Sequence, residues 1–174
     1  MKKFLALMML ACIALLPLVS NAEVPVVTWD AVGAPAVESL GLEGEFKTLP
    51  ELGLAIWVPG TMNYIEPTAD QAAEGAYVIF ADEDCTLFIT ALHQDGMTLD
   101  AFAEGAVAAG YTDAEIVNVN GLYAVTYKDD EHSIGFITLV DTNSNMITFN
   151  FSPINTDLAQ AGFSIIASSL MPME

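Results

Sequence analysis

The segment from residue 118 to residue 153 constrains the fold most, because its pattern predicts three or four consecutive β-strands. Asn120-Gly121 separates two apolar runs, and this pair favours the positive φ angles that a two-residue hairpin turn requires. Polar breaks at residues 129–132 and 141–145 predict two further chain reversals. Strands joined by such short turns pair antiparallel, so the segment predicts an antiparallel meander.

Both faces of these strands are rich in apolar side chains. Side chains alternate across a strand, so Tyr123, Val125 and Tyr127 share one face of their strand. Phe136 belongs to one face of the next strand, and Ile137 belongs to the other. A sheet with one wet face would carry polar residues at every second position, which these two strands do not. We therefore expect helices on both sides of the sheet.

Residues 1–22 have the features of a secretory signal peptide. Lys2 and Lys3 precede an apolar run over residues 4–18, and Ser20-Asn21-Ala22 offers a small-x-small cleavage site. The apolar run continues beyond Cys12, which disfavours lipid attachment at that cysteine. The sequence predicts cleavage after Ala22 and a mature protein that is secreted or otherwise extracytoplasmic.

The mature chain is strongly acidic. Cleavage leaves Lys47 and Lys128 against 23 acidic residues, a formal charge of −21, and the chain has no arginine. Nucleic acids and anionic membranes would repel such a protein, so both are excluded as direct partners. A surface of this kind keeps an exported protein soluble, and it attracts cations or basic partners.

Cysteine usage points to a fold without disulfides. Cys12 leaves with the signal peptide, so Cys85 has no intramolecular partner and the domain depends on its hydrophobic core. Asp84 precedes Cys85 and disfavours the thiolate, so we interpret Cys85 as a structural residue rather than a nucleophile.

The remaining elements alternate between helices and pairs of strands. Apolar spacing predicts a helix that ends at Gly41 and either begins near Ala34 or is kinked, because Pro35 is tolerated only in a first turn or at a kink. Residues 44–49 and 52–58 predict a hairpin, and Thr68 opens a capping box before one helical turn. Strands follow at residues 77–81 and 86–93, then a helix capped by Thr98 and a final helix capped by Asn155 or Thr156.

This order predicts an α+β fold with an antiparallel β-sheet flanked by helices, an α/β/α sandwich, and excludes a doubly wound parallel sheet. We divide the chain into the signal peptide (1–22), an N-terminal extension with a helix and the first strand (23–52), and an α+β core (53–174). The extension and the core are expected to form one compact domain.

The pattern resembles the PsbP-like α/β/α sandwich family over residues 53–170. The features that carry the resemblance are a strand ending at Pro59, the helix after Thr98, the Asn120-Gly121 turn before a strand with Tyr123 and Tyr127, and the closing helix. The resemblance implies a binding or scaffold protein with no shared catalytic residues, so it implies no site residue here. Fold similarity does not assign function.

Candidate catalytic groups are few. His93 ends a strand and His132 lies in an acidic turn; both have the sequence context of exposed turn residues. The chain contains no Gly-x-Ser-x-Gly, His-Glu-x-x-His, Cys-x-x-Cys or phosphate-binding loop motif. We therefore do not expect an enzyme. A small secreted hydrolase is the least supported alternative.

Two acidic turns are candidate Ca²⁺ sites, because Ca²⁺ prefers six to eight oxygen ligands. Neither turn has the spacing of an EF-hand loop, so we expect solvated turns, with Ca²⁺ binding as the alternative. The candidate ligands are Asp82, Asp84, Asp129, Asp130 and Glu131.

Four aromatic residues, Trp57, Tyr64, Tyr123 and Tyr127, lie on or beside strands and are candidates for a recognition surface. Core packing explains these four residues at least as well, since aromatic residues are common in strands. The alternation of Trp57 with Ile56 and Val58 predicts that Trp57 lies on the less buried face. Taken together, the sequence predicts a secreted, non-catalytic binding or scaffold module whose partner is an unidentified extracellular protein or small ligand, with Ca²⁺ binding as the alternative.

Overall fold

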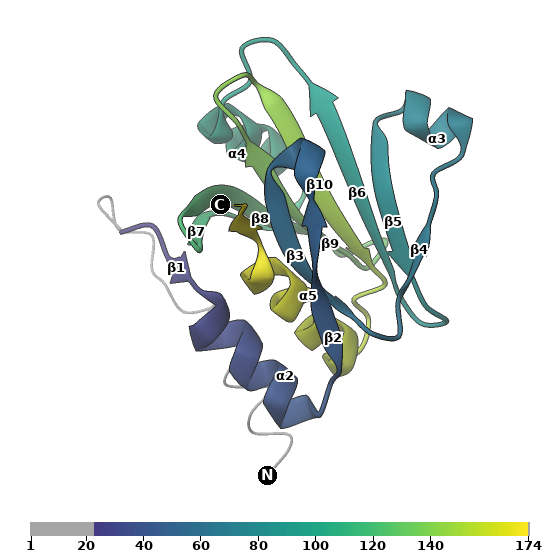
Figure 1. The fold of residues 1–174 in the computed structure, drawn as a ribbon. Coiled ribbons are helices and arrows are strands. Elements are labelled where there is room, and N and C mark those ends of the chain that lie inside the picture. Colours follow the sequence, from purple (N-terminus) through teal and green to yellow (C-terminus); the bar gives the residue numbers. More distant parts are fainter. Residues whose placement is uncertain (1–22, 174) are drawn as a thin grey trace.

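The computed structural model describes residues 23–173 (Figure 1), so the predicted signal peptide and Cys12 lie outside the described residues. The large sheet contains eight strands in the order β1-β7-β8-β9-β10-β6-β5-β4. Every neighbouring pair in this sheet is antiparallel except β1 with β7. Its strands are β1 (Val26–Val27), β4 (Asn63–Ile65), β5 (Ala76–Ala81), β6 (Thr86–His93), β7 (Thr112–Val119), β8 (Leu122–Asp129), β9 (Ile134–Val140) and β10 (Asn145–Ser152).

A second, three-stranded antiparallel sheet has the order β11-β3-β2. β2 (Gly44–Leu49) and β3 (Leu54–Pro59) form the predicted hairpin around a 3₁₀ turn, Pro50–Leu52, and β11 (Met171–Pro172) adds the end of the chain to β3. The sequence does not reveal β1, β4 or β11, because strands of two or three residues show no periodicity; residues 59–75 are expected to be a connection with one helical turn, but they contain β4.

Four α-helices accompany the sheets in the part of the chain that the structure describes. They are α2 (Ala34–Leu40), α3 (Ala69–Ala73), α4 (Leu99–Ala108) and α5 (Asp157–Ser169), and a π-helical turn, Trp29–Gly33, leads into α2. α2 begins at Ala34 with Pro35 in its first turn, and Gly41 ends it in the left-handed conformation, as predicted. Thr68, Thr98 and Thr156 cap the other three helices.

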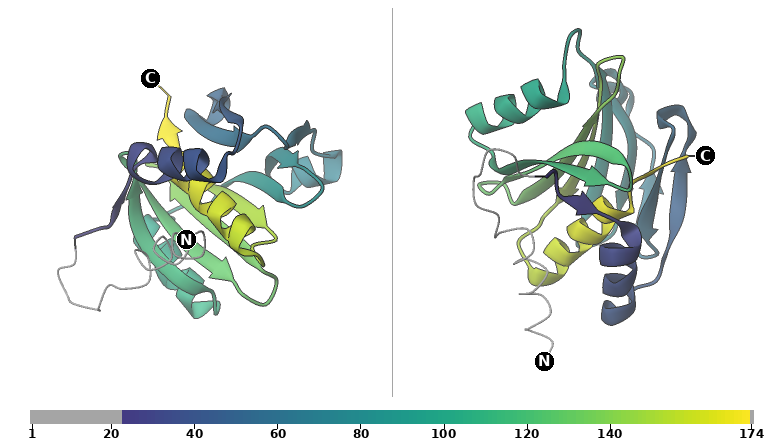
Figure 2. Two further views of the ribbon diagram at one scale, coloured as in Figure 1. Left: turned by 90° about the horizontal axis from the view of Figure 1, so that it is seen from below. Right: turned by 90° about the vertical axis from the view of Figure 1, so that its left-hand side faces the viewer.

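The small sheet and α5 lie on one side of the large sheet, and α4 lies on the other side (Figure 2). The main core lies between the large sheet, β3 and α5, and includes Ile56, Ile137, Phe149 and Ile166. On the far side, α4 covers β7 and β8 and packs against Val125 and Tyr127. The predicted α+β class, an antiparallel sheet flanked by helices, is confirmed.

The predicted turns of the meander are present. Asn120 and Gly121 have φ values of 49° and 91°, the positive angles that the two-residue hairpin between β7 and β8 requires. The other two turns lie where the polar breaks predicted them, between β8 and β9 and between β9 and β10.

The expectation that helices cover both faces holds for only part of the large sheet. Among the described residues, α4 contacts β7 and β8, and the cluster beneath it extends no farther than Phe136 on β9. The same side of β10 and β6 carries a mixture of polar and apolar side chains, and none of them is buried. On the other side of the sheet, Leu158 of α5 is exposed.

Candidate binding face

The side chains of β10, β6 and β4 that point away from the main core form a surface beside the area that α4 covers, since α4 packs on β7 and β8 and α5 packs on the core side. Alternation places Leu87 and Ile89 in the core, so Phe88, Thr90 and Leu92 point to the other side. We call this surface the open half-face and define it by Ile65, Phe88, Thr90, Leu92, Met146, Thr148 and Asn150. All seven side chains are partly or largely accessible.

The centre of the open half-face is a row of threonines in register across three strands. Thr90 lies opposite Thr148, and Thr148 lies opposite Thr138. The hydroxyls of Thr148 and Thr138 are 2.9 Å apart, and the Tyr127 hydroxyl is 3.1 Å from that of Thr138. Because Tyr127 and Thr138 are buried, the hydroxyl row runs from the open surface to the region under α4.

Apolar rows flank the threonines on both sides. In one row, Ile65 pairs with the buried Ile79, and Ile79 pairs with Phe88. In the other row, Leu92 pairs with Met146, which pairs with Val140. Leu92 is 45% exposed, so a large apolar side chain faces water at this end of the surface. Cross-strand rows of this kind present apolar and hydroxyl groups together to any partner.

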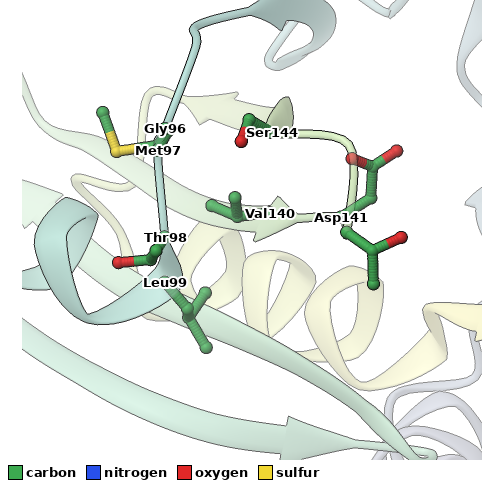
Figure 3. Close-up of a pocket in the computed structure, with 8 residues that line it drawn as sticks. Gly96, Met97, Thr98, Leu99, Val140, Asp141 and Ser144 are labelled. Atoms are coloured by element: carbon green, nitrogen blue, oxygen red, sulfur yellow. The ribbon is translucent and has the colours of Figure 1, made fainter.

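A hollow of about 320 Å³ extends the surface toward α4 (Figure 3). Val140 forms its floor, and Met97, Thr98 and Leu99 at the start of α4 form one wall. Asp141 and Ser144 in the β9–β10 turn form the opposite wall. A second hollow of about 340 Å³, lined by Lys128, Asp130 and Gln160 among others, lies near the β8–β9 turn.

His93 joins the two loops beside the first hollow. Its Nε2 lies 2.9 Å from Asp95 Oδ1, and its Nδ1 lies 3.1 Å from Asn145 Oδ1. The Asn145 amide donates to Asp141 Oδ2 at 2.7 Å, which leaves its carbonyl oxygen toward His93. Both ring nitrogens therefore face acceptors, an arrangement that suits the imidazolium. The hydrogen bonds to Asp95 and then Asn145 raise the pKa of His93 above its ordinary value.

His93 lines neither of the two hollows, and its side chain is exposed. His132 makes a local contact of 2.8 Å with Asp129 Oδ2 in the β8–β9 turn and is also exposed. That hydrogen bond raises the pKa of His132 and lowers the pKa of Asp129. Neither histidine is placed beside a hydroxyl or thiol nucleophile by any hydrogen bond of the described residues.

Two carboxylates of the acidic turns, those of Asp82 and Asp130, accept hydrogen bonds from nearby groups of the same chain. Asp82 accepts from the backbone N–H groups of Asp84 and Cys85 with Oδ1 and from Thr61 with Oδ2. Although burial alone would raise it, these hydrogen bonds lower the pKa of Asp82. Asp130 accepts from Thr112 at 2.8 Å. Asp84 and Glu131 are exposed. No group of three or more His, Cys, Asp or Glu side chains suited to a metal ion occurs within residues 23–173.

The four candidate aromatic residues do not form one surface. Trp57 is 4% exposed and packs against Trp29, Ala36 and Ile165, so the prediction of a less buried face is wrong: α2 and the π-turn cover it. Tyr127 is 6% exposed beneath α4 and stacks on Phe136. Neither can belong to a recognition surface. Tyr64 and Tyr123 are 61% and 55% exposed, but they lie on β4 and β8, near opposite ends of the large sheet.

The border of the open half-face is acidic. The connections between its strands contain no lysine or arginine, and His93 is their only neighbour that can carry a positive charge. Lys47 pairs with Glu45, and Lys128 pairs with Asp113 at 2.8 Å. The acidic border residues are Glu66, Asp70, Glu74, Asp82, Glu83, Asp84, Asp95 and Asp141.

Cys85 lies just before β6 and is partly buried, with no disulfide partner in the described chain. Burial, together with Asp82 and Asp84, raises the pKa of its thiol, which opposes a nucleophilic role. No helix within residues 23–173 has the length and apolar character needed to cross a membrane.

The fold is that of a PsbP-like protein. The structure is similar to the solution structure of cyanobacterial PsbP (CyanoP) from Synechocystis sp. PCC 6803, with a TM-score of 0.54 and 17% sequence identity over 90% of this chain and 99% of that chain. Similarity at this level of identity shows the fold alone. No protein-family model and no curated protein matches the chain.

Proposed function

We propose that the mature chain is a non-catalytic binding module that works outside the cytoplasm and contacts its partner through the open half-face. The location is proposed from the features of residues 1–22, which are those of a secretory signal peptide. The PsbP-like fold is compatible with this role but does not assign it.

The observation that carries the proposal is the contrast between the two halves of one sheet face. Under α4, Val125 and Tyr127 are buried, whereas Leu92 and Ile65, on the uncovered half, are 45% and 46% exposed. Apolar side chains that gather on an exposed surface commonly mark a site of contact with another molecule. The described histidines, by contrast, form hydrogen bonds with carboxylates and an amide within or beside loops.

Site-specific photo-crosslinking in the cell that exports the protein tests this function. A benzophenone amino acid replaces Leu92 on the open half-face or, as a matched control, the exposed Leu158 of α5, the helix that packs on the opposite side of the large sheet. We expect one discrete adduct from position 92 and none of that size from position 158. Equal adducts from both positions, or none from position 92, would contradict the proposal.

A further inference from the structure

We infer that the open half-face binds a cationic polypeptide segment that carries apolar side chains. This inference rests on the proposed function, because it names the chemistry of the partner for the same surface. The alternatives of a nucleic acid or an anionic lipid are opposed by the charge of the chain.

The floor of the surface is neutral. Phe88, Leu92 and Met146 supply apolar area, and Thr90 and Thr148 supply hydroxyls that donate and accept hydrogen bonds. No residue of the open half-face is charged. A partner therefore buries apolar side chains here without desolvating a charge of this protein, which would be costly.

The border of the surface has one sign of charge. Asp82, Glu83 and Asp84 lie in the turn at one end of β6, and Asp95 and Asp141 lie in the loops at its other end. Asp70 and Glu74, around α3, lie between β4 and β5. Lysine or arginine side chains at the edges of a partner would meet these carboxylates, which speeds association and selects against acidic partners.

A second copy of the chain fits the surface poorly. Two open half-faces placed together would bring two acidic borders against one another, and like charges across an interface are repulsive. Both described lysines already pair with carboxylates of the same chain, so they do not relieve that repulsion. Charge complementarity thus favours a basic partner over self-association.

The test uses the purified mature protein and three synthetic peptides of equal length. One is composed of lysine and leucine (Lys/Leu), one of glutamate and leucine (Glu/Leu), and one of lysine and serine (Lys/Ser). We expect calorimetric binding of Lys/Leu, no binding of Glu/Leu, and binding of Lys/Ser at least about tenfold weaker than Lys/Leu. Raising the salt from about 0.1 M to about 1 M shortens the Debye length from about 10 Å to about 3 Å, so Lys/Leu binding weakens as well. Equal binding of Lys/Leu and Lys/Ser would overturn the inference.

Matched variants separate binding at the open half-face from general attraction to an acidic protein. Leu92→Lys and Leu158→Lys add the same charge at exposed leucines on opposite sides of the large sheet. We expect L92K to weaken Lys/Leu binding about tenfold more than L158K does. Leu92→Ser, compared with Leu158→Ser, removes apolar area without adding charge and provides the second test if a lysine variant unfolds. Equal losses within both pairs would overturn the inference.

The outcome of the crosslinking experiment distinguishes this inference from the proposed function. If position 92 forms its adduct but Lys/Leu does not bind, the partner chemistry is wrong and the binding function stands. If position 92 forms no specific adduct, the proposed function fails, and the inference fails with it.

Discussion

The side-chain amide of Asn120 lies 2.8 Å from the carbonyl oxygen of Leu170, the residue that caps the C-terminus of α5. The same amide donates to the carbonyl of Ser168 at 2.7 Å, and the Asn120 carbonyl oxygen accepts from the backbone N–H of Trp29 at 2.9 Å. One turn residue therefore joins the meander, the final helix and the N-terminal segment, and it satisfies carbonyls that the end of a helix leaves without partners.

Replacing Asn120 with glycine should lower the free energy of unfolding by about 2–4 kcal/mol, because three partly buried hydrogen bonds are lost. Glycine tolerates the positive φ of this position, so the turn itself is preserved. Urea denaturation measures the loss. Asn118→Ala in the same hairpin removes one exposed bond to Gly121 and should cost about 1 kcal/mol or less. Equal losses of unfolding free energy in the two variants would contradict a special contribution of the Asn120 hydrogen bonds to stability.

The Ser169 hydroxyl accepts from the backbone N–H of Trp57 at 2.9 Å in the buried contact between α5 and β3. Ser169→Ala leaves that N–H without its acceptor and should cost about 1–3 kcal/mol, measured by chemical denaturation. Ser164 is the control, because its hydroxyl donates only to the carbonyl of Gln160 in its own helix. Ser164→Ala should change stability by less than about 0.5 kcal/mol. A comparable loss in both variants would show that the Trp57 contact contributes little.

His93 should titrate above the ordinary histidine pKa, because Asp95 and Asn145 accept from its two ring nitrogens. A pKa raised by folding contributes stability that is fully present below the pKa of the unfolded chain and is lost as pH rises through the folded pKa. Asp95→Asn should lower the pKa of His93 in an NMR titration and leave that of His132 unchanged. Asp129→Asn should do the reverse. If each histidine had the same pKa in the parent protein and in both variants, the proposed effects of Asp95 on His93 and of Asp129 on His132 would be contradicted.

The Cys85 thiol should react slowly with iodoacetamide near neutral pH, because burial and the carboxylates of Asp82 and Asp84 raise its pKa. The pH dependence of the alkylation rate reports this pKa directly. Asp84→Asn removes one negative charge and should shift the rate profile toward lower pH, whereas the more distant Asp100→Asn should not. If the alkylation rate of Cys85 had the same pH dependence in the folded protein and in the urea-unfolded chain, the folded environment would not raise the pKa of the thiol.

Local signals predicted most of the architecture. The Asn120-Gly121 turn, the threonine caps and the position of Pro35 each follow from the conformational preference of a few residues, so the structure has them where the sequence places them. The tertiary bonds of Asn120 are invisible to such rules, since they depend on where α5 ends in space. The same holds for β1 and β11, which form only because neighbouring strands offer free edges.

The recognition residues were harder to predict, because burial is decided by elements distant in sequence. Trp57 alternates correctly with Ile56 and Val58, but α2 covers the second face of β3, so both faces are buried. The open half-face does have a sequence signal: Met146, Thr148 and Asn150 alternate with the buried Ile147 and Phe149. The patterns of β8 and β9 alone predict two covered faces, because α4 covers the outer side of β8 and reaches Phe136 on β9.

Oxidative footprinting of methionine, performed on the purified protein and in the intact exporting cell, tests the proposed binding face most directly. Met146 lies on the open half-face, and Met173 near the C-terminus is 39% exposed and provides the internal control. We predict that Met146 is oxidised in the purified protein but protected in the cell, while Met173 is oxidised equally in both. Equal oxidation of Met146 in the two settings would contradict binding through the open half-face.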